Sequence, residues 1–101
     1  MAQGDTINFY KHNLANGSNL EIKPGADVGA ATDQWVIHNV SVSGKALLLA
    51  TDGTNMLQLD APLAAKWWSN LVFHPTSTYW IRINNNSGGN IDVYWCGVQT
   101  K

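Results

Sequence analysis

The chain lacks most features that define common functional classes. It contains a single cysteine, Cys96, among its 101 residues. One cysteine cannot form an intrachain disulfide, which excludes the small disulfide-stapled secreted modules. No apolar run approaches the roughly 18 residues of a membrane-spanning helix. The first residues show neither a basic region nor an apolar stretch, so we expect no signal peptide and no membrane partner.

Charge is also scarce. Six basic and seven acidic residues leave a net charge of −1, and the basic residues are scattered singly along the chain. Proteins that bind nucleic acids gather Lys and Arg on one surface, where these residues displace phosphate counterions. The sequence shows no such cluster, so we expect no nucleic-acid partner.

No motif for catalysis or for metal binding is evident. The three histidines, His12, His38 and His74, are not spaced with one another or with Cys96 in the way that metal ligands are. No nucleophile, base and orienting group can be assembled from neighbouring residues. We therefore expect a protein that is not an enzyme and that holds no cofactor or metal.

Tryptophan, in contrast, is abundant. Each indole can bury roughly 150–250 Å², and five of them in a chain of this length exceed what one small core needs. We infer that part of this aromatic surface contacts a partner. Adjacent strand residues point to opposite faces, so one indole of the Trp67-Trp68 pair is expected to point inward and the other outward.

The remaining pattern is that of strands. Apolar residues alternate with polar ones and are punctuated by Gly, Asn, Asp and Ser, which predicts an all-β antiparallel sandwich or a jelly-roll-like fold of about eight short strands. The chain is expected to form one domain over residues 1–101, with an N-terminal arm at 1–19 that is polar enough to be flexible alone. A single helical turn is expected within Asp60–Trp68. The strands are expected at Thr6–Lys11, Leu20–Lys23, Gln34–Val42, Lys45–Thr51, Asn55–Asp60, Trp67–His74, Tyr79–Asn84 and Ile91–Val98.

Three connections suggest how these strands pair. Ser43-Gly44 suits a two-residue hairpin turn, and Asp52-Gly53 is typical of a type I′ turn. The longer loop 84–90 is expected to close a third hairpin. Symmetric closure would place Arg82 opposite Asp92 as an ion pair on the outer face. It would place Trp80 opposite Tyr94 beside that pair, with the core side formed by Ile81, Ile83, Ile91, Val93 and Trp95.

The central strands carry apolar residues on both faces. Strict alternation in Gln34–Val42 puts Val36, Val40 and Val42 on one face with His38, and puts Trp35 and Ile37 on the other. In the next two strands Leu47, Leu49 and Met56 lie opposite the expected core face. A strand that is apolar on both faces is buried on both sides. The simplest second layer for a chain of this size is a neighbouring subunit.

Five short segments occur in a recognisable order over the last two thirds of the chain: Trp35–Asn39, Thr51–Asn55, Val72–His74, Tyr79–Ile83 and Gly97–Lys101. In this order they resemble the short β-rich proteins encoded among the structural genes of tailed bacteriophages. None of the segments is catalytic, and the part of the chain through Asp33 carries no such resemblance.

This resemblance implies a component of the virion. The role that it implies for a domain of this size is that of a decoration (cement) protein, made in the host cytoplasm and bound to the outer capsid surface. Such proteins often assemble as trimers or dimers and add buried area between subunits of the major capsid protein. The resemblance assigns no residue to the contact.

Two hypotheses of different class follow. The first is a structural virion protein that stabilises the capsid shell, or in a variant a tail or fibre module of the same virion. The second is a small carbohydrate-binding lectin, which explains the excess of tryptophan and the surface rich in Asn, Gln and Ser equally well. The residues that we expect to contact the partner are Trp80, Tyr94, Arg82, Trp68, Leu47, Leu49 and Met56.

Overall fold

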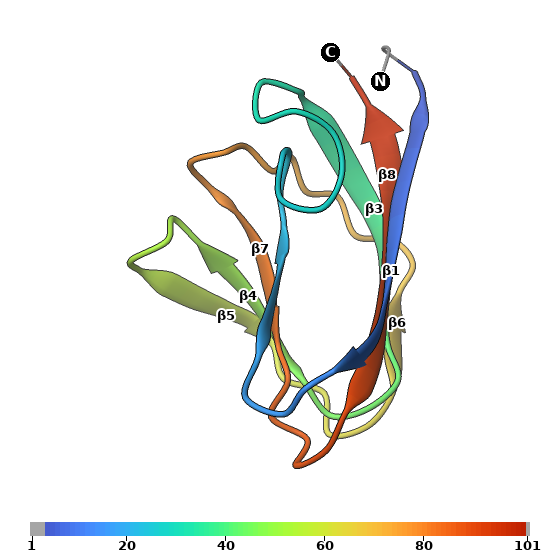
Figure 1. Cartoon of the computed structure of the whole chain (residues 1–101), viewed down its shortest axis with the longest axis vertical. Coiled ribbons are helices and arrows are strands. Elements are labelled where there is room, and N and C mark those ends of the chain that lie inside the picture. The colour runs from blue at the N-terminus through green and yellow to red at the C-terminus, as the bar shows by residue number, and fades with distance from the viewer. Residues whose placement is uncertain (1–3, 101) are drawn as a thin grey trace.

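A computed structural model describes residues 4–100 and shows two four-stranded sheets facing each other (Figure 1). One sheet has the strand order β1-β8-β3-β6, and the other has the order β2-β7-β4-β5. We call them sheet A and sheet B. The strands are β1 (Thr6–Leu14), β2 (Asn19–Ile22), β3 (Trp35–Val42), β4 (Leu47–Thr51), β5 (Met56–Asp60), β6 (Lys66–Trp68), β7 (Trp80–Asn84) and β8 (Ile91–Gln99).

The pairing of the strands follows the jelly-roll winding. The first strand pairs with the eighth, the second with the seventh, the third with the sixth and the fourth with the fifth, and every pair is antiparallel. The predicted all-β sandwich of eight short strands is therefore confirmed. Jelly rolls occur both in viral capsid domains and in lectins, so this fold agrees with either functional hypothesis and selects neither.

The core lies between the two sheets. Its centre on the sheet A side is a pair of indoles, Trp35 and Trp95, with ring centroids 5.4 Å apart. The apolar face predicted for the last two long strands is confirmed as buried. The buried apolar residues are Ile7, Leu14, Leu20, Ile22, Trp35, Ile37, Val40, Val42, Ala46, Leu48, Leu49, Ala50, Trp80, Ile81, Ile83, Ile91, Val93 and Trp95.

The hairpin predicted around loop 84–90 is wrong. The strand before the loop, β7, belongs to sheet B, and the strand after it, β8, belongs to sheet A. Asn85 fixes this crossing between sheets. Its side chain is fully buried, and its amide nitrogen donates to the carbonyl oxygens of Leu14 and Gly89, each at 2.7 Å. Trp80 therefore does not lie opposite Tyr94, because the two residues are on different sheets.

The connection through Ser43-Gly44 is also not a hairpin, since β3 and β4 lie in different sheets. The Asp52-Gly53 turn does join a hairpin, β4–β5, but as a four-residue loop and not as a type I′ turn. Gly53 has a positive φ of 98°, whereas Asp52 does not. The Asp52 carboxylate accepts hydrogen bonds from the backbone N–H groups of Thr54 and Asn55.

Strand β3 contains a β-bulge that strict alternation does not predict. Ile37 lies opposite Gly97, and Asn39 lies opposite the adjacent Cys96, so His38 is an extra residue in the ladder. A bulge of this kind resets which face the following side chains occupy. Trp35, Ile37, Val40 and Val42 are consequently all buried in the core, which corrects the predicted division of this strand between two faces.

Gly97 permits the close strand contact at this bulge. A Cβ atom at Gly97 would lie 2.1 Å from the carbonyl oxygen of Val36, which no side chain can tolerate. Cys96 and Asn39 are thereby held side by side on the outer face of sheet A.

Two other expected elements differ from the structure. The strand expected over Trp67–His74 is limited to β6, after which the chain contributes one further bridge between Phe73 and Ile37. The segment 61–65 forms no helical turn and connects β5 to β6 as irregular chain. Within the expected arm, residues 6–14 form β1 and pair with β8, whereas residues 1–3 lie outside the described range.

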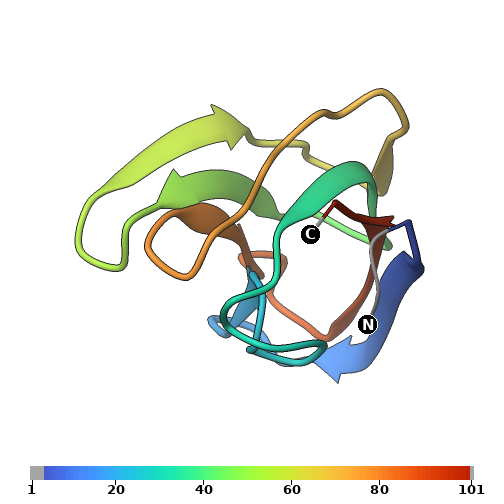
Figure 2. The ribbon, with the colours of Figure 1, turned by 90° about the horizontal axis from the view of Figure 1, so that it is seen from above.

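Strands β4 and β5 differ in their surroundings. Strand β4 is buried on both faces, as its sequence predicts, but the second layer comes from the same chain and requires no neighbouring subunit for Leu49. Strand β5 is the edge strand of sheet B, and Met56 to Leu59 are exposed on both of its faces. Seen from above, the β4–β5 hairpin extends past the rest of the sandwich on one side (Figure 2).

Candidate functional site

The outer face of sheet A carries three exposed aromatic residues in a single row. Tyr10 of β1 lies opposite Tyr94 of β8, Tyr94 lies opposite Ser41 of β3, and Ser41 lies opposite Trp67 of β6. The side chains of such a row point to the same face of the sheet. The exposed fractions of Tyr10, Tyr94 and Trp67 are 56%, 40% and 66%. Three of the large exposed apolar side chains therefore lie along one line across four strands.

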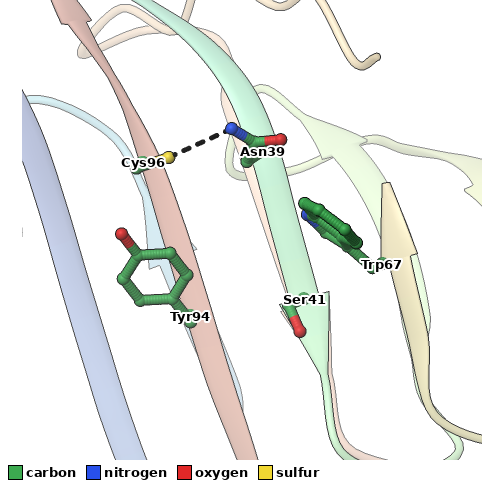
Figure 3. Close-up of a pocket in the computed structure, with 5 residues that line it drawn as sticks. All are labelled: Asn39, Ser41, Trp67, Tyr94 and Cys96. Carbon is green, nitrogen blue, oxygen red and sulfur yellow. Dashed lines mark hydrogen bonds between the residues drawn. The ribbon is translucent and has the colours of Figure 1, made fainter. Parts of the chain in front are cut away.

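A hollow opens in this row where its smallest member stands. Tyr94 and Trp67 flank Ser41, and Asn39 and Cys96 complete the lining of a hollow of about 450 Å³. Figure 3 shows the Tyr94 ring face-on and the Trp67 indole nearly edge-on, with Ser41 between them. We call these five residues the sheet A groove. None of them carries a formal charge at neutral pH.

Polar groups in the groove are held in place. The Asn39 amide nitrogen lies 3.3 Å from the Cys96 sulfur, as drawn in Figure 3. The reversed amide satisfies more partners, since its nitrogen then donates to the Ser69 carbonyl oxygen at 3.2 Å and its oxygen accepts from His38 Nδ1 at 3.1 Å. Either orientation anchors this side chain. Desolvation, followed by the neighbouring Cys96, raises the pKa of the Tyr94 phenol, which therefore stays protonated and able to donate.

A second polar cluster borders the row at the Tyr10 end. The Asp92 carboxylate accepts hydrogen bonds from the Tyr10 hydroxyl at 2.7 Å and from the Asn13 backbone N–H at 3.0 Å, and it contacts His12 Nδ1 at 2.9 Å. The backbone hydrogen bond from Asn13 and the Tyr10 hydroxyl lower the pKa of Asp92. Ser43 holds the backbone of Asp92 through two hydrogen bonds. Asp92 thus belongs to this cluster and does not pair with Arg82.

Trp80 and Arg82, two of the predicted contact residues, lie on the outer face of sheet B, where neighbouring side chains already bind them. Arg82 forms an ion pair with Glu21 of β2, with its Nη2 2.6 Å from Oε1. Glu21 also accepts a hydrogen bond from the Trp80 indole N–H at 2.7 Å, and the Lys23 ammonium lies 3.8 Å from the centroid of that indole. Trp80 is consequently only 7% exposed and has little surface left for a partner.

Three more of the predicted contact residues, Leu47, Leu49 and Met56, share that face of sheet B. Leu49 lies opposite Arg82, and Met56 lies opposite Thr51, which in turn lies opposite Trp80. Leu49 is buried, so a Leu49→Asp substitution would destabilise the fold itself and could not be used to test an interface. Leu47 is half-buried, and Met56 is exposed, with its sulfur 3.4 Å from Arg82 Nη1.

The expected inward and outward division of the Trp67-Trp68 pair is confirmed, and Trp67 is the outward member. Trp68 packs against the core and donates its indole N–H to Asp60 at 2.9 Å. Lys66 also binds this carboxylate. The Asp60 carboxylate thus ties the short strand β6 to the end of β5 and fixes the strand that presents Trp67.

The structure brings together residues that the sequence analysis did not select. Tyr10, Ser41 and Asn39 join Tyr94 only because β1 and β3 both pair with β8. Alternation alone would have favoured Trp68 as the outward member, because its neighbours at two-residue spacing are the polar Lys66 and Asn70. No local signal in the sequence marks Tyr10 as part of the same row as Trp67.

Comparisons with known proteins do not assign a function to the chain. No protein-family model matches the chain, and no curated protein matches its sequence. Across residues 4–100 the structure holds no apolar helix of membrane-spanning length. In the same range no three His, Cys, Asp or Glu side chains are grouped in a way that suits a metal ion.

Proposed function

We propose that this protein is a binding protein whose sheet A groove holds a neutral carbohydrate. The single observation that supports this most strongly is the in-register arrangement of Tyr94, Ser41 and Trp67. A pyranose ring has an apolar C–H face that packs on an aromatic ring and a rim of hydroxyl groups that require hydrogen-bond partners. The groove offers both kinds of surface, which binding sites for small molecules combine.

The uncharged lining of the groove supports a neutral ligand. Tyr94 and Trp67 supply the apolar surface, and Ser41, Asn39 and the Tyr94 hydroxyl supply hydrogen-bonding groups. A charged group placed against these rings would lose hydration without gaining a counter-charge from the lining. Hydroxyl groups can exchange water for amide and hydroxyl partners at little cost. Among the hypotheses drawn from the sequence, the lectin therefore takes precedence.

Titration calorimetry against neutral oligosaccharides, selected by a glycan array, tests this proposal. Tyr94→Ala should lower the affinity for the selected sugar at least tenfold, which is about 1.4 kcal/mol. The matched control is Tyr79→Ala, because Tyr79 is a comparably exposed tyrosine outside the groove. Equal losses in both variants, or no sugar bound by the unaltered protein, would contradict the assignment.

A structural role in a virion remains a second candidate, favoured by strand β5. Within residues 4–100 its outer edge has no strand partner, and both its faces expose apolar side chains. Monomeric proteins normally protect such edges, which otherwise pair with another chain. The inward-facing Leu57 is 62% exposed, because the opposite sheet does not extend over it. In this role β5 contacts the major capsid protein or a further copy in a dimer or trimer.

Co-sedimentation with assembled phage shells, together with the mass in solution, tests the second candidate. Leu57→Lys should abolish shell binding or lower the oligomer mass, since it places a charge in the contact. Leu63→Lys is the control, because Leu63 is also exposed but lies outside the strand. Unchanged shell binding and oligomer mass for Leu57→Lys would show that β5 is not the contact strand. Binding to tail fibres and not to shells would favour the tail or fibre alternative.

A further inference from the structure

The aromatic row of sheet A continues beyond the groove. Tyr10 does not line the groove, yet it lies directly opposite Tyr94 in the β1–β8 pair. Opposite side chains in an antiparallel pair have Cβ atoms about 4.5–5.5 Å apart. Tyr10 therefore extends the surface of Tyr94 on the side away from Trp67.

The Tyr10 ring is fixed before any ligand binds. Its hydroxyl donates to Asp92, and its ring stacks on His12 with centroids 6.2 Å apart and an interplanar angle of 28°. A side chain that is already ordered loses less conformational entropy when it contacts a ligand. Tyr10 thus has the properties of a preorganised contact surface.

The length of the row sets the size of the ligand. Neighbouring strands are roughly 4.8 Å apart, so the backbone positions of Trp67 and Tyr10, three strands apart, are separated by about 14 Å. One sugar ring can contact the groove but cannot also reach Tyr10. A chain of at least three linked rings is needed to cover Trp67, Tyr94 and Tyr10 together.

Polar groups line the row on both sides along this path. On one side the outer-face residues are Asn8, Cys96 and Asn39, which lie opposite one another across three strands. On the other side are His12, Asp92 and Ser43, which are joined by hydrogen bonds. An aromatic line between two polar borders matches a chain of sugar rings, whose apolar faces lie along its axis and whose hydroxyl groups project to both sides.

We infer that the site takes an extended, neutral oligosaccharide of at least three residues, laid across the strands from Trp67 to Tyr10. This inference rests on the proposed function and adds to it the class of ligand and the role of Tyr10. Tyr10 is a contact residue for the third ring, and Asp92 is its positioning residue.

The test is a length series measured by titration calorimetry. The probes are cello-, xylo-, manno- and malto-oligosaccharides of one to six residues. In the series that binds, affinity should rise by about three- to tenfold when the third ring is added and should change little afterwards, as expected for one further aromatic contact. Tyr10→Ala should remove this increase and leave the affinity for the disaccharide unchanged. Tyr10→Phe keeps the ring but loses its hydrogen bond to Asp92, so it should keep an increase that is smaller than that of the unaltered protein.

The outcomes separate this inference from the proposed function. Binding whose strength is the same for two and for three or more rings would overturn the inference and leave the sheet A groove in place. A loss in Tyr10→Ala that is equal at every length would overturn it as well, since the residue would then act through the groove or the fold. If no series binds, the proposed function fails, and this inference fails with it.

Discussion

Each sheet carries a tryptophan on its outer face, and the two tryptophans differ sharply in solvent exposure. On sheet A, Trp67 stands beside a serine and is 66% exposed. On sheet B, Trp80 is 7% exposed, although it also points away from the core. Glu21 accepts its indole N–H, and Lys23 lies over its ring.

The comparison shows that the direction of a side chain does not decide whether it is available. On sheet B, the Glu21 carboxylate pairs with Arg82 and also accepts the Trp80 indole N–H, and the Lys23 ammonium lies over the ring, so this face is satisfied internally. Sheet A leaves the rings of Trp67 and Tyr94 exposed and places polar groups at the borders of the row. Uncovered apolar surface with polar borders is the arrangement typical of a ligand site.

The largest expected difference between the faces is in stability. Trp80→Ala removes a nearly buried indole and leaves Glu21 without one of its donors, so the free energy of unfolding should fall by about 3–5 kcal/mol. Trp67→Ala removes an exposed side chain and should cost less than about 1 kcal/mol. Urea denaturation of both variants measures this. Similar losses for the two variants would contradict the assignment of Trp80 to the structure and Trp67 to the surface.

The second difference is in binding. Trp67→Ala should lower the affinity for the oligosaccharide at least tenfold, about 1.4 kcal/mol, because the wall of the groove is lost. Trp80→Phe, which keeps a ring on sheet B, should leave that affinity unchanged. Calorimetry on the two folded variants measures the contrast. A loss of binding in Trp80→Phe alone would move the site to sheet B.

The third prediction concerns the ion pair that covers sheet B. Glu21→Gln removes the charge that holds Arg82 and weakens the hydrogen bond to Trp80, so the free energy of unfolding should fall by about 1–2 kcal/mol. The hydrogen bond to Glu21 raises the pKa of Arg82, so it favours the charged guanidinium. The fluorescence emission of Trp80 should shift as its indole becomes more exposed. An unchanged denaturation curve would show that the cover of Trp80 does not depend on Glu21.

The smallest expected effect is a change in acid sensitivity at Asp60. Hydrogen bonds from Lys66, from the Trp68 indole and from the Ala61 backbone lower the pKa of Asp60 from 3.8 to about 2. A carboxyl group with a lowered pKa in the folded state stabilises the fold above about pH 4, and this contribution is lost as the pH falls towards 2. Asp60→Asn should therefore reduce the dependence of stability on pH between 4 and 2. Acid titrations followed by circular dichroism compare the variant with the unaltered protein, and parallel curves would contradict the role of Asp60.

Much of the fold could be predicted from the sequence, because alternation and turn residues report local geometry directly. The eight strands and the core face of β7 and β8 follow from that pattern. The pairing of the strands did not follow, because a loop such as 85–90 can close a hairpin or cross between sheets. The crossing depends on Asn85, whose buried hydrogen bonds involve Leu14, far away in the sequence.

The candidate site was less predictable for the same physical reason. Tyr94 was selected, but its predicted neighbour Trp80 belongs to the other sheet, and its true neighbours, Tyr10 and Ser41, come from strands distant in sequence. The bulge at His38 is a second obstacle, since one extra residue in the ladder turns Asn39 and Ser41 to the outer face. A row that takes one residue from each of four strands has no sequence motif.

The most direct test of a carbohydrate site on sheet A is an NMR titration with a neutral oligosaccharide. It follows the indole N–H signals of the five tryptophans. Each face of the sandwich then reports in the same sample, with Trp67 on sheet A and Trp80 on sheet B. We expect a saturable shift of the Trp67 signal and an unchanged Trp80 signal. A shift of Trp80 with Trp67 unmoved, or no shift of either signal with any oligosaccharide of the series, would contradict this expectation.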